Sequence, residues 1–165
     1  MQVLVPFVEL VKKHFNFLLD DYDFIVQESI GMFGETITFK SSHLTIEICK
    51  DRESIIIFLK PIGEPEVARL GLSNILDANS VSIPSIFNGP VAPAQFASAL
   101  ESYASLLRKH ANDLLRGDLS NWLQFLQLHL EKMKKDYSSL TKGKRLPTRV
   151  YQELESYIHS KRGAS

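Results

Sequence analysis

The sequence predicts an α+β fold in which a small antiparallel sheet is surrounded by helices. Two observations carry this prediction. Four short runs of β-type residues follow one another between residues 22 and 60, and most segments outside them have the apolar spacing of a helix. The four runs span residues 22–29, 35–40, 44–50 and 54–60. Gaps of only a few residues join antiparallel neighbours, so we expect a four-stranded meander.

Helices are expected both before and after the strands in the sequence. Apolar residues recur at helical spacing between Phe7 and Leu19, which predicts an N-terminal helix. Pro93 opens the clearest helical pattern, which ends at Gly117, a residue typical of helix C-termini. A second long helix follows and runs to Met133. The short connection at Gly117 predicts that these two helices form a long antiparallel hairpin packed on the sheet.

The chain is short enough for one core. We expect residues 1–140 to form a single α+β domain, including a short helix at residues 67–77 and a loop over residues 78–93. Residues 141–165 are expected to add a basic linker and a short C-terminal helix, over residues 149–159, to the same domain.

Composition excludes several classes of protein. The 19 basic and 19 acidic residues balance, which removes a global electrostatic argument for a nucleic-acid or membrane partner. Residues 131–165 are the exception, with nine basic residues against four acidic ones. A single cysteine allows no internal disulfide, and the N-terminal residues resemble neither a signal peptide nor a membrane span. We therefore expect a cytoplasmic protein.

No pattern predicts a catalytic, metal or cofactor site. The five histidines never occur as a ligand-spaced pair on one element, and neither a glycine-rich phosphate loop nor a serine-hydrolase motif is present. Cys49 is interpreted as an ordinary strand cysteine, since Glu47 beside it would raise a thiol pKa. We expect no enzymatic activity, no metal and no cofactor.

Two charged groups are candidates for contact with a partner. The first is an acidic turn at Asp20, Asp21 and Asp23, although turn chemistry alone also explains aspartates there. The second is a basic set near the C-terminus, which a solvated helix face also explains. Its members predicted to contact a partner are Lys142, Lys144, Arg145 and Arg149. If this basic set binds phosphates, the predicted partner is a nucleic acid.

Three segments resemble a family of small bacterial α+β proteins. They are residues 103–120 (YASLLRKHANDLLRGDLS), residues 16–24 (NFLLDDYDF) and residues 44–48 (LTIEI). The similarity covers residues 8–130 and includes no recognised catalytic motif. Members of this family are regarded as immunity-type or antitoxin-like partners, so the resemblance implies a related fold and a role in binding another protein.

The leading hypothesis is therefore a small, non-enzymatic bacterial protein-binding protein, an immunity or antitoxin-type neutraliser that covers the surface of a partner such as a toxin or effector. A nucleic-acid-associated accessory protein that uses the basic C-terminal segment is the alternative. An enzyme with dispersed catalytic residues comes third, and it requires a pocket that holds Asp20, Asp23 or His43. No membrane partner is expected, and the sequence identifies neither the binding surface nor the oligomeric state.

Overall fold

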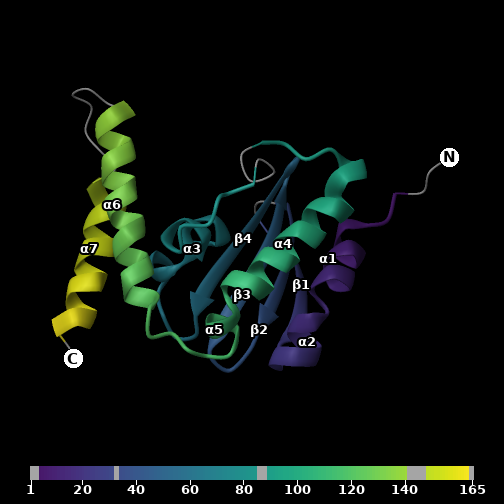
Figure 1. The fold of residues 1–165 in the computed structure, drawn as a ribbon, viewed down its shortest axis with the longest axis horizontal. Helices are drawn as coiled ribbons and strands as arrows, with labels where there is room; N and C mark the ends of the chain where they lie inside the picture. The colour runs from purple at the N-terminus through teal and green to yellow at the C-terminus, as the bar shows by residue number, and fades with distance from the viewer. Residues whose placement is uncertain (1–3, 32–33, 85–88, 141–147, 164–165) are drawn as a thin grey trace.

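Five antiparallel strands form one sheet, and helices pack against it (Figure 1). The structure, a computed structural model, describes residues 4–31, 34–84, 89–140 and 148–163. The strands are β1 (Ile25–Gly31), β2 (Gly34–Lys40), β3 (Leu44–Asp51), β4 (Ser54–Pro61) and β5 (Leu70–Gly71), and they lie side by side in that order. The α+β class and the antiparallel sheet are confirmed. The expected number of four strands is wrong, because the two residues of β5 pair with β4.

The helices occupy most of the remaining described chain. They are α1 (Phe7–Phe15), α2 (Phe17–Tyr22), α3 (Leu72–Ala78), α4 (Phe96–His110), α5 (Asn112–Leu115), α6 (Trp122–Leu140) and α7 (Thr148–Gly163), with short 3-10 turns η1 (Glu66–Ala68) and η3 (Pro93–Gln95). None of the helices in the described ranges combines the length and the apolar character that a membrane crossing requires.

The start of the sheet differs from the prediction. Residues 20–22 belong to α2, where a turn and the beginning of a strand were expected. Asp23 then takes a left-handed conformation with φ 57°, and the N–H of Phe24 donates to the carbonyl of Leu18 at 3.0 Å. This arrangement closes helix ends, and Asp is one of the few residues that adopt it readily. The first strand therefore begins at Ile25.

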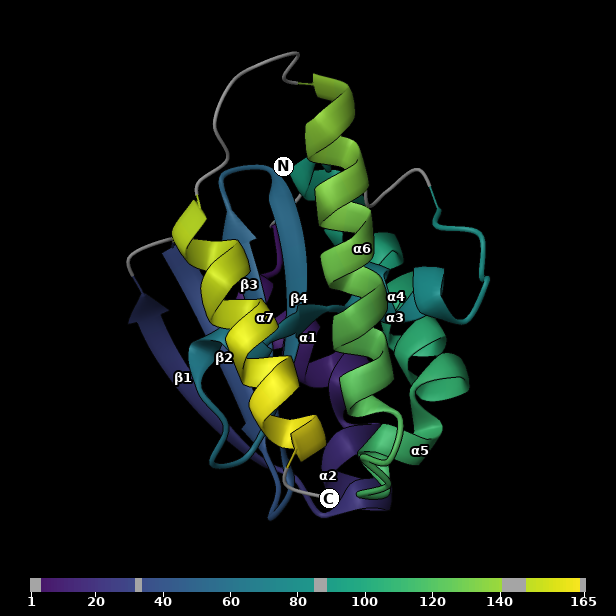
Figure 2. The same ribbon diagram turned by 90° about the vertical axis from the view of Figure 1, so that its left-hand side faces the viewer.

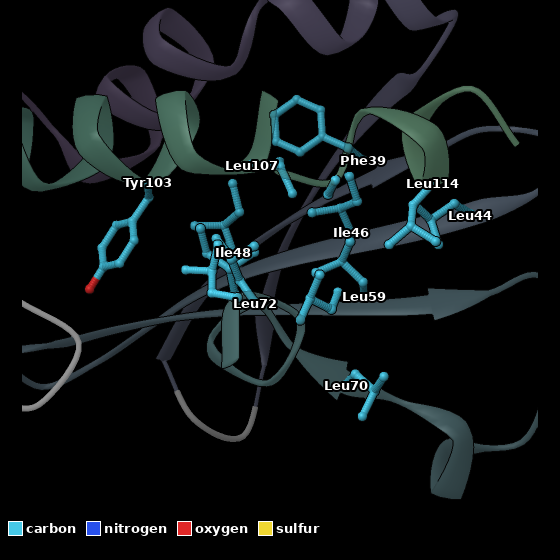
Figure 3. Packing of buried hydrophobic residues seen from close by; sticks show 14 of the residues in the cluster. Phe39, Leu44, Ile46, Ile48, Leu59, Leu70, Leu72, Tyr103, Leu107 and Leu114 are labelled. Atoms are coloured by element: carbon cyan, nitrogen blue, oxygen red, sulfur yellow. The ribbon is translucent and has the colours of Figure 1, made fainter. Parts of the chain in front are cut away.

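The core lies between one face of the sheet and the helices α1 and α4 (Figure 3). Successive side chains of a strand point to opposite faces, so every second residue of the central strands enters the core. These residues are Ile37 and Phe39 of β2, Leu44, Ile46 and Ile48 of β3, and Ile55, Ile57 and Leu59 of β4. The helices contribute Val11, Phe15, Tyr103 and Leu107. Figure 3 shows Tyr103 and Leu107 reaching from α4 towards the strands.

The opposite face of the sheet is covered only in part. Arg69 lies with its guanidinium carbon 4.0 Å from the centroid of the Phe58 ring and pairs with Glu47 at 3.5 Å. Figure 2 shows α7 in front of the sheet on this side, while β1 lies at the margin. Side chains of β1 on this face are exposed, and Ile25 retains 60% of its surface. We call this side the open face.

The predicted hairpin of the two long helices is wrong. α4 lies across the sheet, whereas α6 packs against α3 and α7 (Figures 1 and 2). The indole N–H of Trp122 donates to the carbonyl of Ala68 at 3.1 Å, and His129 bonds Asn74 at 2.8 Å. A short connection limits the distance between helix ends but not the angle between the helices. These contacts set that angle and direct α6 away from α4.

α7 is held by both apolar and polar contacts. It packs against α6 and η1, and its buried residues are Tyr151, Leu154 and Ile158. Glu64, which follows β4, accepts hydrogen bonds from the Tyr157 hydroxyl at 2.5 Å and from the Lys161 ammonium at 2.9 Å. These bonds, that of Tyr157 foremost, hold the pKa of Glu64 below its ordinary value.

The contacts of Glu64 predict that the docking of α7 depends on pH. A carboxylate whose pKa is lowered by folding stabilises the folded state above its unfolded pKa, near 4.5, and this contribution disappears as the pH falls through the folded pKa. Urea unfolding at a series of pH values should therefore show a Glu64→Gln variant that is less stable than the wild type at neutral pH. The gap should narrow in acid.

A matched control is Glu101→Gln, which alters an exposed carboxylate on α4. Its unfolding free energy should follow that of the wild type at every pH. A Glu64→Gln variant with the same pH dependence as the wild type would contradict the role given to these hydrogen bonds.

Candidate functional site

The structure places the two predicted partner-binding groups on different sides of the molecule. Asp20, Asp21 and Asp23 lie at the end of α2, whereas Arg149 lies in the first turn of α7 (Figure 1). Arg149 is exposed and pairs with Glu153, one helical turn later, at 2.9 Å. The other predicted basic residues lie outside the described ranges; they are Lys142, Lys144 and Arg145. The described members of the two groups therefore do not share one surface.

Basic residues on α6 are also engaged in ion pairs. Lys132 pairs with Asp77 of α3 at 3.1 Å, and Lys134 pairs with Glu155 of α7. Both pairs link helices that pack together. A phosphate would bind Lys132 or Lys134 only by displacing these carboxylates, because both ammonium groups are already paired.

The acidic turn belongs to a larger surface assembled from separate segments. The Tyr22 hydroxyl donates to Oδ1 of Asn112 at 2.7 Å, which fixes the end of α2 against α5. Arg108 of α4 donates to Asp21 at 2.8 Å. We call the resulting surface the acidic end. Its exposed carboxylates are those of Asp20, Asp21, Asp23, Asp113 and Asp118.

Sequence reasoning missed Asp113 and Asp118. The bond between Tyr22 and Asn112 joins residues 90 positions apart, and no periodic pattern reveals such a contact. Asp118 carries a local signal, because it precedes a helix and accepts hydrogen bonds from Ser120. These bonds, that of the Ser120 hydroxyl foremost, lower the pKa of Asp118, so its carboxylate is ionised at neutral pH.

A depression of about 460 Å³ adjoins the acidic end. It lies between the end of α2, the turn that joins β2 to β3, and the end of α5. Its lining consists of Asp21, Tyr22, Asp23, Ser41, Ser42, His43, Leu115 and Arg116. Two of the residues that the enzyme hypothesis requires in a pocket, Asp23 and His43, are therefore brought together.

His43 links two elements within this depression. Its Nε2 lies 3.0 Å from the carbonyl oxygen of Leu115, which can only accept, so Nε2 carries a proton. Nδ1 lies 3.4 Å from the hydroxyl of Ser42, a long contact for a hydrogen bond. The ring also packs closely on Gly117. His43 thus ties the β2–β3 turn to the end of α5, which gives the residue a structural role.

Other reactive groups in the described ranges are not arranged for chemistry. No three His, Cys, Asp or Glu side chains among the described residues gather closely enough to share a metal ion. Cys49 is half-buried on the open face, where burial raises the pKa of its thiol and the Thr36 hydroxyl lies 3.6 Å from Sγ. A raised pKa disfavours the reactive thiolate. The acidic end is the most clearly assembled candidate for contact with another molecule.

No protein-family model, curated protein or solved structure matches this chain. The family resemblance inferred from its sequence segments therefore stays a prediction. Any functional proposal rests on the geometry of the acidic end and of the sheet.

Gly117 provides a test of the packing beneath the depression. Its φ of +94° is strained for any residue with a side chain, and an added Cβ would lie 3.3 Å from the His43 ring. We expect Gly117→Ala to reduce the free energy of unfolding by about 1–3 kcal/mol, measured by urea titration. The imidazole resonances of His43 should also shift in the NMR spectrum.

Gly63→Ala is the matched control. Gly63 also has a positive φ, +81°, but no atom lies within 4 Å of an added Cβ. Both substitutions introduce backbone strain, and only the one at Gly117 presses on His43. Equal losses of stability in the two variants would show that the His43 contact contributes nothing.

Proposed function

We propose that this chain is a non-enzymatic bacterial protein-binding protein of the immunity or antitoxin type, which neutralises a partner by covering part of its surface. The observation that carries the proposal is the acidic end, where contacts among α2, α4 and α5 join segments that carry exposed aspartates, with Arg108 and Arg116 among them. The complement of such a surface is a basic patch on a partner protein.

The acidic end is held on a rigid support. Leu18 of α2 and both Leu114 and Leu115 of α5 are buried in the core, within two residues of an exposed aspartate in the chain. Arg116 donates from Nε to Oδ1 of Asn112 at 3.3 Å, which adds to the bond from Tyr22. A surface that is already ordered loses little conformational entropy when it binds, and this supports a role in recognition.

The exposed carboxylates of the acidic end suit a protein that covers a basic surface of its partner. Asp20 accepts a hydrogen bond from Asn16 within its own helix turn, at 2.5 Å, and stays exposed. A lysine or arginine of a partner has access to such a carboxylate without disturbing the core. Exposed charges at an interface mainly accelerate association and select the partner, which is what a neutraliser of a charged target needs.

Charge reversal at the acidic end tests the proposal. A tagged chain expressed in its native host is expected to co-purify with a defined protein, which mass spectrometry identifies and which neighbouring reading frames should encode. The double substitution Asp20→Lys with Asp113→Lys should weaken that complex about tenfold or more, since it replaces attraction with repulsion. Titration calorimetry at fixed salt measures the change.

The matched control reverses two exposed glutamates elsewhere, Glu35→Lys with Glu101→Lys, and leaves the affinity unchanged. A chain that captures no protein in its native host contradicts the proposal. Filter binding to nucleic acid over a range of salt concentrations examines the alternative, because phosphate contacts produce a steep loss of affinity as salt increases.

A further inference from the structure

β1 leaves one edge of the sheet open. It is the first strand in the sheet order, and within the described part of the chain it pairs only with β2. Figure 2 shows it at the margin of the sheet, with no described helix or strand beyond it. β1 has seven residues, each in continuous register with β2. An edge of this length presents a row of unpaired N–H and C=O groups to which another strand can bind.

The register identifies which backbone groups face outwards. The N–H of Ser41 donates to the carbonyl at the start of β3 at 2.9 Å, so the backbone of Lys40, one residue earlier, faces β1. Lys40 lies opposite Ile25. Backbone direction alternates along a strand, which turns the N–H and C=O groups of Val26 and Glu28 away from β2 and towards the free edge.

As far as residues 4–31, 34–84, 89–140 and 148–163 show, the edge lacks the features that usually prevent pairing. Proteins protect free edges with proline, lysine, a bulge or a covering element. β1 contains neither proline nor lysine, and its register with β2 shows no bulge. Its one charged residue, Glu28, is paired with Lys12 of α1. Ile25, at the beginning of the strand, is 60% exposed. The edge is therefore neutral and apolar at one end.

We propose that β1 pairs antiparallel with β1 of a second copy of this chain, about a two-fold axis at Gln27. Val26 of each copy then lies opposite Glu28 of the other, and these residues exchange backbone hydrogen bonds. Ile25 lies opposite Ser29 and loses part of its exposure to water. An axis at Glu28 would instead place two carboxylates directly opposite each other, which is unfavourable.

The other edge of the sheet limits the assembly to two copies. β5 contains only Leu70 and Gly71, and the chain continues directly into α3, which packs against β4 and β5. Among the described residues β1 is the longest stretch of free edge, so pairing uses the same surface on both copies and closes upon itself. Two five-stranded sheets then form a single sheet of ten strands. Because the free edge of β1 is neutral, two copies of it do not repel each other. A highly charged strand of another protein would find no opposite charge on this edge.

Sedimentation equilibrium of the full chain, from micromolar to near-millimolar concentration, tests this inference. We expect a reversible monomer–dimer equilibrium of modest affinity, because pairing of one short strand buries a small interface. Gln27→Lys and Gln27→Glu each place two like charges at the axis, and each should weaken the dimer about tenfold or more. Mixing the two variants should restore a dimer, since opposite charges then meet.

Glu28→Pro removes an outward N–H and no bond between β1 and β2, so it should leave a folded monomer. Circular dichroism verifies that each variant is folded, and Glu101→Lys on α4 is a control that should dimerise like the wild type. A chain that stays monomeric at every concentration overturns the proposal, as does a dimer that survives the substitutions at Gln27 and Glu28. A mixture of the two Gln27 variants that remains monomeric overturns the placement of the axis.

Discussion

Burial of the sheet on one side is the constraint on which the rest of the structure depends. Ile46 and Ile48 are fully buried beneath the helix layer, while Thr45 and Glu47, their neighbours on β3, point to the open face. Because side chains alternate along a strand, a shift of one residue in the pairing would exchange the two faces. The helix layer of α1 and α4 therefore fixes the register of the hairpins. Because α1 and α4 cover the other face, only the remaining segments, such as α7, can cover the open face (Figure 2).

Local patterns explain why the first four strands and the long helices were predictable. Alternation along residues 35–60 and short turns belong to neighbouring residues, and they require no knowledge of the rest of the fold. The partner of α6 was not predictable in this way. A stripe that includes Trp122 and Leu126 indicates a buried helix face without naming what covers it. The bond from Trp122 to Ala68 spans 54 positions, and β5 is too short to show any pattern.

The acidic end also combines residues that a local sequence pattern identifies with residues that only a long-range contact identifies. Asp20, Asp21 and Asp23 stand out because they are close in sequence, whereas Asp113 joins them only through the contact between Tyr22 and Asn112. The depression beside them contains the histidine and aspartate that catalysis would require. His43, however, directs its protonated nitrogen to the carbonyl of Leu115, so this proton serves to hold α5 in place. This role of His43 supports the proposal that this end of the molecule serves recognition.

The free edge belongs to the sheet, whereas the acidic end is formed by α2, α5 and the connection to α6. β1 begins two residues after Asp23, so one end of the free edge adjoins the acidic surface. Antiparallel pairing about Gln27 directs the two copies of β1 in opposite directions and carries the two acidic ends to opposite ends of the joined sheet. The aspartates of the two copies are then kept apart, which leaves each acidic end accessible to the proposed basic partner. Edge pairing and partner binding therefore use different residues of the chain, even though the two surfaces adjoin near Asp23.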